Sequence, residues 1–368
     1  MKILVLGAAG FIGSHLTERL LASGRHEVHG FDIEQEKIDG LRDQPGFHFI
    51  QGDLRWEAPI VKEMVSESDV VIDLIAHANP SPYIERPLDV FHLNFNENVK
   101  IAEWCVEADR RLIQFSTCEV YGKTVASVAG DHLDNPEAPI HAHFAEDQTD
   151  FILGPVCQHR WIYACAKQLL ERVLHAMGMK YGMNWSVVRP FNFIGPKIDY
   201  LPHEQKGNPR VFSHFMTALL TGERMPLVDG GHHKRCFTYI SDAIDCIVRL
   251  VEDPEASCQQ IFNIGNPRNE MSIRDMAHQM REIFEEKFAG PDYRQPEIVE
   301  VPAVEFYGEG YEDSDRRIPN IDKARNLLGW EPTTDLHTTL EKSMEYYARR
   351  ELHSQSRAGG PQVVREDL

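Results

Sequence analysis

Short apolar runs alternate with amphipathic segments through the first half of the chain. The runs at residues 2–6, 27–32, 48–51, 70–74, 111–117 and 185–189 have the length of buried β-strands. Segments with helical periodicity lie between them, notably at residues 14–21, 90–108 and 161–177. Strands that alternate with helices predict an α/β fold with a Rossmann-like, doubly wound parallel sheet and right-handed crossovers.

The pattern is less regular after Arg189-Pro190. A helix at 241–251 and a strand at 260–264 are expected to return to the first sheet. We therefore expect a Rossmann domain of residues 1–190 plus 240–265. A smaller, discontinuous α/β substrate domain would comprise residues 191–239 plus 266–350. Residues 353–368, which are polar and glycine-containing, predict a flexible tail.

A glycine-rich turn follows the first predicted strand. Gly7, Gly10 and Gly13 have GxxGxxG spacing, with Phe11 and Ile12 between the last two glycines. Such glycines let the backbone approach a pyrophosphate, whose charge the helix N-terminus then binds. Because a tight strand–helix turn needs glycine in any case, this motif alone does not establish a cofactor site.

Two acidic residues follow the next strands. Asp32 ends the second strand, 19 residues after Gly13. A carboxylate there accepts hydrogen bonds from the adenosine ribose and repels a 2′-phosphate, which favours NAD over NADP. Asp53, followed by Leu54, either bonds the adenine amino group or caps a helix. Together with the turn, these residues predict NAD as the cofactor.

Three further residues predict oxidation of an alcohol. Tyr163 and Lys167 are four apart on a predicted helix, so they share one face. A nearby ammonium lowers the pKa of a tyrosine, and the phenolate can take a proton from a substrate hydroxyl as hydride leaves for the cofactor. Thr117, at the end of a strand, would hydrogen-bond to that hydroxyl. Tyr163 and Lys167 would also contact the cofactor.

With these motifs the chain resembles the extended short-chain dehydrogenase/reductase family of nucleotide-sugar enzymes, over everything but the tail. Within that family it is most similar to UDP-glucuronic acid decarboxylases, such as the decarboxylase half of bifunctional polymyxin-resistance enzymes. The matching segments are Arg160-Trp161-Ile162-Tyr163, Arg189-Pro190-Phe191-Asn192, Asp229-Gly230-Gly231, Lys234-Arg235-Cys236-Phe237-Thr238 and Tyr307-Gly308-Glu309-Gly310-Tyr311.

The resemblance implies roles for further residues. Glu119 matches an essential carboxylate beside Thr117, and Arg317 matches an arginine that acts near C5 of the sugar. The alternative for Glu119 is a solvated carboxylate at a strand end. Implied substrate-binding residues, which could instead form surface ion pairs or ordinary packing contacts, are Pro80, Tyr83, Asn192, Arg210, Arg235 and Tyr311. The two arginines would meet the diphosphate of a UDP-sugar.

Two departures from the family pattern stand out. Cys118 occupies a position where the similar decarboxylases have Ser, and a thiol is a weaker hydrogen-bond donor than a hydroxyl. If that Ser relays a proton, Cys118 slows decarboxylation or changes the substrate; if it only packs, the exchange is tolerable. Residues 126–150 also form an insertion that is expected to border the site and to alter sugar selection.

The reaction implied is NAD-dependent oxidation of UDP-glucuronate at C4, followed by loss of carbon dioxide. The product is UDP-4-keto-pentose, or UDP-xylose after re-reduction. Three alternatives stay open: a UDP-uronate or hexose 4-epimerase, a 4,6-dehydratase and a non-catalytic NAD-binding regulator. Cys118 disfavours the dehydratase, because it stands where those enzymes have an acidic proton donor. The intact Thr117, Tyr163 and Lys167 disfavour the regulator.

The composition of the chain limits which kinds of partner it can bind. A net charge of −19 argues against nucleic-acid binding, and no apolar run reaches the roughly 18 residues of a membrane span. The absence of a leader and seven scattered cysteines predict reduced thiols in the cytoplasm. His77, His141 and His143 have no carboxylate or cysteine at ligand spacing, so no metal is expected. The resemblance implies a homodimer that pairs the helices at 90–108 and 161–177.

Overall fold

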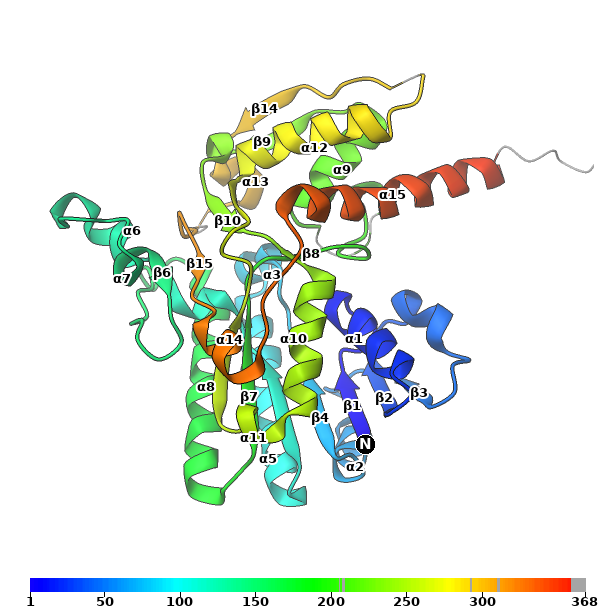
Figure 1. The fold of residues 1–368 in the computed structure, drawn as a ribbon, viewed down its shortest axis with the longest axis vertical. Helices are drawn as coiled ribbons and strands as arrows, with labels where there is room; N and C mark the ends of the chain where they lie inside the picture. Colours follow the sequence, from blue (N-terminus) through cyan, green and yellow to red (C-terminus); the bar gives the residue numbers. More distant parts are fainter. Residues whose placement is uncertain (205, 207–208, 292, 310–311, 359–368) are drawn as a thin grey trace, which may run out of the picture.

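The computed structural model describes residues 1–204, 206, 209–291, 293–309 and 312–358. Its centre is a parallel sheet of seven strands in the order β12-β7-β5-β4-β1-β2-β3 (Figure 1). This order, which starts from β1 and runs outward to both sides, confirms the Rossmann-like doubly wound fold. The strands are β1 (Lys2–Leu6), β2 (Glu27–Asp32), β3 (Phe47–Gln51), β4 (Val70–Asp73), β5 (Arg111–Phe115), β7 (Trp185–Pro190) and β12 (Gln260–Ile264).

Helices cover both faces of this sheet. α1 (Phe11–Ala22) packs against α10 (Ile240–Glu252) on one face, and α2 (Ala58–Ser66), α5 (Asn98–Ala108) and α8 (Trp161–Tyr181) cover the other (Figure 1). Consecutive residues of the inner strands, such as Leu4, Val5 and Leu6, are therefore all fully buried. A strand buried on both faces needs an unbroken apolar run, and such runs marked these strands in the sequence.

All six strands predicted in the first half of the chain are present, with small differences at their ends. β5 ends at Phe115, two residues before its predicted end. The predicted helix at 90–108 is three consecutive segments: α4 (Pro87–Phe91), the π-helical η2 (His92–Glu97) and α5. Within η2 the buried Asn94 side chain bonds both the N–H and the carbonyl of His77. A π-helical turn of this kind is common beside functional sites.

The remaining elements lie mostly above the carboxyl ends of the central strands (Figure 1). Two-stranded pairings join β10 to β13 and, in parallel, β8 to β11, β9 to β14 and β6 to β15. These elements are η1 (Glu36–Leu41), α3 (Pro80–Glu85), η3 (Cys118–Tyr121), β8 (Phe193–Ile194), η5 (Pro202–Glu204), α9 (Val211–Thr221), β9 (Met225–Val228), η6 (Asp229–Gly231), β10 (Lys234–Cys236), β11 (Thr238–Tyr239), α11 (Pro254–Ser257), β13 (Glu270–Ser272), α12 (Ile273–Lys287), β14 (Ile298–Val301), α13 (Ala303–Tyr307), β15 (Ile318–Pro319), α14 (Asp322–Leu328) and α15 (Leu336–Ala358).

Two segments differ from expectation. α15 extends to Ala358, so the segment expected to be a flexible tail begins within a helix, and residues 359–368 lie outside the described part. The insertion forms α6 (Val125–Ala129), η4 (Gly130–His132), α7 (Pro139–Ala142) and β6 (His143–Phe144), and its helices project from one side of the molecule (Figure 1). β6 pairs with β15 directly after Arg317. Among the helices of the described chain, none is long and apolar enough to cross a membrane.

Candidate active site

A cavity of about 680 Å³ opens at the carboxyl end of the central sheet. This is the size of a small-molecule site, which is typically about 300–1,000 Å³. The cavity brings together residues that are far apart in the sequence. The predicted site residues that line it are Phe11, Ile12, Pro80, Thr117, Cys118, Glu119, Tyr163, Lys167, Asn192, Arg210, Arg235 and Arg317.

The glycine-rich turn has the geometry of a dinucleotide cradle. Gly7 has φ of +83°, and a Cβ on Gly13 would lie 2.1 Å from the Gly7 carbonyl oxygen. Gly10 precedes α1 without any capping side chain. Asp32 accepts a hydrogen bond from the Ala9 N–H at 2.8 Å, so its carboxylate lies beside the turn. These residues fit the pyrophosphate and the adenosine ribose of NAD.

The second acidic position is engaged with a neighbouring side chain. Asp53 accepts hydrogen bonds from the Arg55 guanidinium, the shortest at 2.6 Å between Oδ2 and Nη2. Leu54 is buried in the core that includes Phe31. Neither residue lines the cavity, so their contact with adenine stays a prediction.

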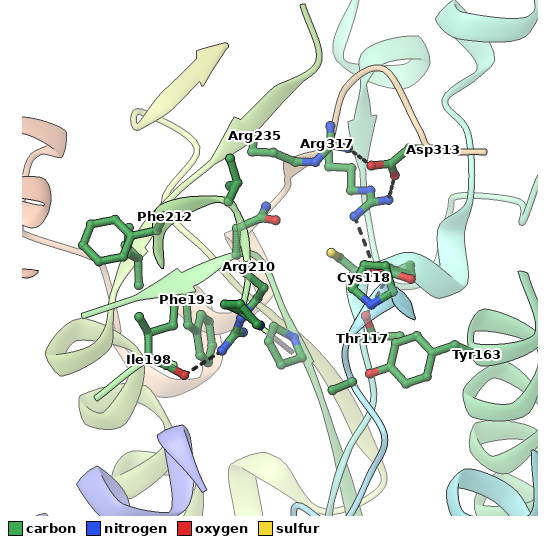
Figure 2. A pocket seen from close by; sticks show the side chains of 18 of the residues that line it. Thr117, Cys118, Tyr163, Phe193, Ile198, Arg210, Phe212, Arg235, Asp313 and Arg317 are labelled. Atoms are coloured by element: carbon green, nitrogen blue, oxygen red, sulfur yellow. Dashed lines mark hydrogen bonds and ion pairs between the residues drawn. The ribbon is translucent and has the colours of Figure 1, made fainter. Parts of the chain in front are cut away.

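Tyr163 and Lys167 lie four residues apart on α8, and both line the cavity with Thr117, which lies two residues beyond β5. Figure 2 shows the Tyr163 ring beside Thr117. The Lys167 ammonium donates to Asn98 Oδ1 at 2.9 Å, and burial lowers the pKa of Lys167 to about 8 despite the opposing charge of Asp73. Burial, reinforced by Glu119, raises the pKa of Tyr163, although Thr117 acts in the opposite direction. The expectation that the ammonium would dominate the tyrosine pKa was therefore wrong, because desolvation of the phenolate is the larger effect.

Glu119 sits in a buried cluster of arginines and carboxylates. Arg160 donates to both carboxylate oxygens of Glu119, at 2.5 and 2.9 Å, and Arg317 lies 3.6 Å from Oε1. Asp313 accepts hydrogen bonds from Arg160, Arg235 and Arg317. Figure 2 shows Asp313 between Arg235 and Arg317. Burial alone would raise the pKa of Glu119, but Arg160 and Arg317 outweigh it and hold that pKa below its usual value. Glu119 is therefore ionised at neutral pH.

Sequence reasoning missed two members of this cluster. Arg160 lies directly before α8, within a segment that matched the family, but no role was assigned to it. Asp313 stands four residues before Arg317 and two after Tyr311. Neither had a local pattern that pointed to the other, since their contact joins positions 153 residues apart.

Cys118 also lines the cavity, with its side chain in an apolar environment. It clusters with Val120, Tyr121, Phe144 and Phe191. Burial raises the pKa of the Cys118 thiol, so it is protonated at neutral pH. Phe144 is the insertion residue in this cluster, and no residue of 126–150 lines the cavity. The insertion therefore reaches the site through packing, whereas it was expected to border it.

The predicted substrate residues fall into separate groups. The Tyr83 ring stacks on Tyr163 at 4.7 Å between ring centroids, from behind the cavity lining. Asn192 has a φ of +42° and its amide donates to the Cys236 carbonyl. Arg210 pairs with Asp199 at 2.8 Å, whereas Arg235 joins the Asp313 cluster (Figure 2). Tyr311 lies outside the described residues.

Histidines near the site are not arranged as ligands. Among the described residues, a group of three metal-ligand side chains forms only at Glu27, His29 and His48, on β2 and β3. His29 and His48 are register partners, and the group does not line the cavity. His77, His141 and His143 do not belong to it.

Known proteins resemble this chain over most of its length. The NAD dependent epimerase/dehydratase family matches residues 3–265. A UDP-D-apiose/UDP-D-xylose synthase from Oryza sativa subsp. japonica is 40% identical, over 94% of this chain and 89% of its own length. UDP-D-apiose/UDP-D-xylose synthase 1 from Arabidopsis thaliana is 39% identical, over 95% of this chain and 92% of its own. The crystal structure of the PbgP3 protein from Burkholderia pseudomallei has a TM-score of 0.81 and 34% identity, covering 96% of this chain and 98% of its own.

The fold, the glycine-rich turn and these relatives define a dinucleotide-dependent enzyme whose cavity brings Thr117, Tyr163 and Lys167 together. The chain belongs to the NAD dependent epimerase/dehydratase family, and its cofactor is NAD. The family resemblance inferred from the sequence is confirmed.

Proposed function

We propose that the chain oxidises UDP-glucuronate at C4 with NAD and then releases carbon dioxide, as a UDP-glucuronate decarboxylase. The observation that carries this proposal is the cluster around Glu119. Arg160, Arg235 and Arg317 bring three positive charges to one end of the cavity, against two negative charges from Glu119 and Asp313. A buried excess of positive charge favours an anionic sugar, a uronate, over a neutral hexose.

The oxidation is carried out by Thr117, which follows β5, and by Tyr163 and Lys167 on α8. The glycine-rich turn and Asp32 would hold NAD⁺, which would supply the acceptor for the hydride of C4. Tyr163 takes the proton of the C4 hydroxyl, which Thr117 orients by hydrogen bonding. Because burial disfavours the Tyr163 phenolate, a positive charge beside it is needed, and Lys167 supplies one while it is protonated.

Decarboxylation follows from the position of the ketone. A ketone at C4 is β to the C6 carboxylate, so the C5–C6 bond can break with its electron pair stored in an enolate. Tyr163 and Thr117 stabilise the enolate oxygen by hydrogen bonding. Glu119 is ionised and has no proton to give, so it acts as an anion that orients Arg317 and a water molecule; C5 takes its proton from that water, and the hydroxide is neutralised by solvent. The product is UDP-4-keto-pentose, or UDP-xylose if the hydride returns.

A second product is favoured by the plant relatives, whose names carry both UDP-D-apiose and UDP-D-xylose. Apiose is a branched isomer of xylose. The same 4-keto intermediate gives it by rearrangement of the carbon skeleton before the hydride returns, so no further oxidant is needed. Cys118, which lines the cavity beside Thr117, stands where the sequence resemblance places a Ser in the decarboxylases.

The test is incubation of the enzyme with NAD⁺ and UDP-glucuronate, followed by measurement of carbon dioxide, nicotinamide absorbance and the mass and NMR spectrum of the nucleotide sugar. We expect carbon dioxide and a UDP-pentose, and no turnover with Tyr163→Phe. An isomeric product of unchanged mass, without carbon dioxide, would replace decarboxylation by 4-epimerisation. The NMR spectrum separates UDP-xylose from UDP-apiose.

We further propose a cytoplasmic homodimer, in which α5 and α8 pair with their copies. All seven cysteines are free thiols, in keeping with a reducing compartment. α5 and α8 pack side by side, and Leu169 on α8 is 45% exposed. Light scattering should give the mass of two chains, and Leu169→Glu should give that of one. The control is Ile60→Glu on α2, which is 41% exposed and lies outside the proposed interface.

A further inference from the structure

Asp313 gathers three arginines from three parts of the chain. Its Oδ2 accepts from Arg235 Nη2 at 2.6 Å, and its Oδ1 accepts from Arg160 Nη2 at 3.3 Å and from Arg317 Nη2. Arg160 precedes α8, Arg235 lies in β10 and Arg317 precedes β15. One carboxylate therefore joins the residue before the helix that carries Tyr163 to β10 and to the segment before β15.

Two of these arginines also hold Glu119. Arg160 is 2% exposed and Arg317 is 3% exposed, so both guanidiniums have little access to solvent and depend on these carboxylates as partners. The Arg317 Nε is buried without a hydrogen-bond partner among the described residues. The orientation of the Arg317 guanidinium is therefore set by its two terminal nitrogens. Within the described chain, these nitrogens form ion pairs only with Asp313 and Glu119.

The segment that carries Arg317 has a second, separate anchor. Glu312 accepts from Lys123 Nζ at 2.5 Å and from the Trp161 indole N–H at 2.7 Å. Glu312 does not line the cavity and contacts none of the three arginines. Removal of Glu312 therefore loosens the same segment without changing the charge of the arginine cluster.

We propose that Asp313 is a positioning residue for the decarboxylation step, which fixes Arg160 and Arg317 around Glu119 and offsets one of the three positive charges that face the sugar. This inference rests on the proposed function. Without the Asp313 carboxylate, the guanidiniums of Arg160, Arg235 and Arg317 would repel one another and turn toward the substrate carboxylate. Stronger pairing with that carboxylate stabilises the ground state, whereas the carboxylate charge is lost as carbon dioxide leaves.

The expected signature is a split between the two chemical steps. C4 oxidation depends on Thr117, Tyr163 and Lys167, none of which forms an ion pair with Asp313. Asp313→Asn should therefore leave the single-turnover appearance of reduced nicotinamide within about threefold of the parent while it slows carbon dioxide release about tenfold or more. The KM for UDP-glucuronate should stay unchanged or fall, because the site gains net positive charge.

The experiment compares the parent, Asp313→Asn, Asp313→Glu and the matched control Glu312→Gln, with rapid-mixing absorbance and carbon dioxide release on each. Glu312→Gln should lower the thermal midpoint but keep both rates. Asp313→Glu keeps the charge but displaces it, and its carbon dioxide rate should lie between those of the parent and Asp313→Asn. If Asp313→Asn does not fold, Asp313→Glu against Glu312→Gln decides. Equal carbon dioxide rates in the Asp313 and Glu312 variants, or equal slowing of both steps, would overturn the proposal. Absence of carbon dioxide from the parent would instead overturn the proposed function.

Discussion

Arg160 donates to both carboxylate oxygens of Glu119, and the pair is almost fully removed from solvent, with 3% and 14% of the two side chains exposed. Arg160 precedes the helix that carries Tyr163, whereas Glu119 lies two residues after Thr117, in the turn that follows β5. The contact therefore links the two halves of the oxidation site, and it fixes the protonation state of the carboxylate that we place at the decarboxylation step.

Replacement of Glu119 by Gln tests that carboxylate. We expect carbon dioxide release to fall about 10²-fold or more, since the neutral amide no longer fixes Arg160 and Arg317 as an ionised carboxylate does. Loss of one of the carboxylates that hold the buried Arg160 guanidinium should also lower the free energy of unfolding by about 3 kcal/mol. Stopped carbon dioxide assays and urea denaturation measure the two effects. Full retention of the rate would refute the role assigned to Glu119.

Replacement of Cys118 by Ser tests the unusual thiol. The thiol is neutral and packs among apolar side chains, so we expect the smaller, more polar hydroxyl to cost about 1–2 kcal/mol of stability. Decarboxylation should stay within about tenfold, because C4 oxidation does not use the thiol. The informative measurement is the ratio of nucleotide-sugar products. An unchanged rate and ratio would mean that the thiol is only tolerated.

The pH dependence of the free enzyme tests Lys167. Its ammonium is needed beside the Tyr163 phenolate, and burial lowers its pKa to about 8. kcat/KM should therefore be bell-shaped: it rises with pH as Tyr163 loses the proton that prevents it from acting as a base, and it falls at higher pH as Lys167 loses its own proton. Asn98→Asp would place a carboxylate where the amide oxygen now lies 2.9 Å from Nζ. An opposite charge raises a lysine pKa, so the falling limb should move to higher pH. If the fall in kcat/KM stays at the same pH in this variant, it reports the titration of a group other than Lys167.

The buried pair of Glu171 and Arg189 should be a main determinant of stability. Glu171 lies one turn beyond Lys167 on α8, and its Oε2 accepts a hydrogen bond from Arg189 Nη2 at 2.5 Å. Both side chains are at most 5% exposed. Glu171→Gln should lower the free energy of unfolding by about 3–5 kcal/mol, because it leaves a buried charge unpaired. The control is Glu252→Gln, whose partner Arg25 is 61% exposed and whose loss should cost about 1 kcal/mol or less. Similar losses in the two variants, measured by urea denaturation, would contradict this ranking.

Local patterns in the sequence were enough to predict the fold and the cofactor turn. Unbroken apolar runs marked the parallel strands, because strands covered on both faces need such runs. The glycine spacing identified the turn because the backbone there requires glycine: Gly7 has a positive φ, and a Cβ on Gly13 would collide with the Gly7 carbonyl oxygen. The spacing of Tyr163 and Lys167 placed them on one face of α8, since residues four apart on a helix are neighbours.

Only the tertiary structure decided how the charges pair and which protonation states result. Asp313 meets Arg160 across 153 residues of chain, and no local pattern encodes such a contact. Burial reversed the expected pKa shift of Tyr163, and two arginines outweighed burial at Glu119. The chain pattern therefore determined which chemical groups reach the carboxyl end of the sheet. Their desolvation and their partners, which depend on the packing of distant segments, determined what those groups can do there.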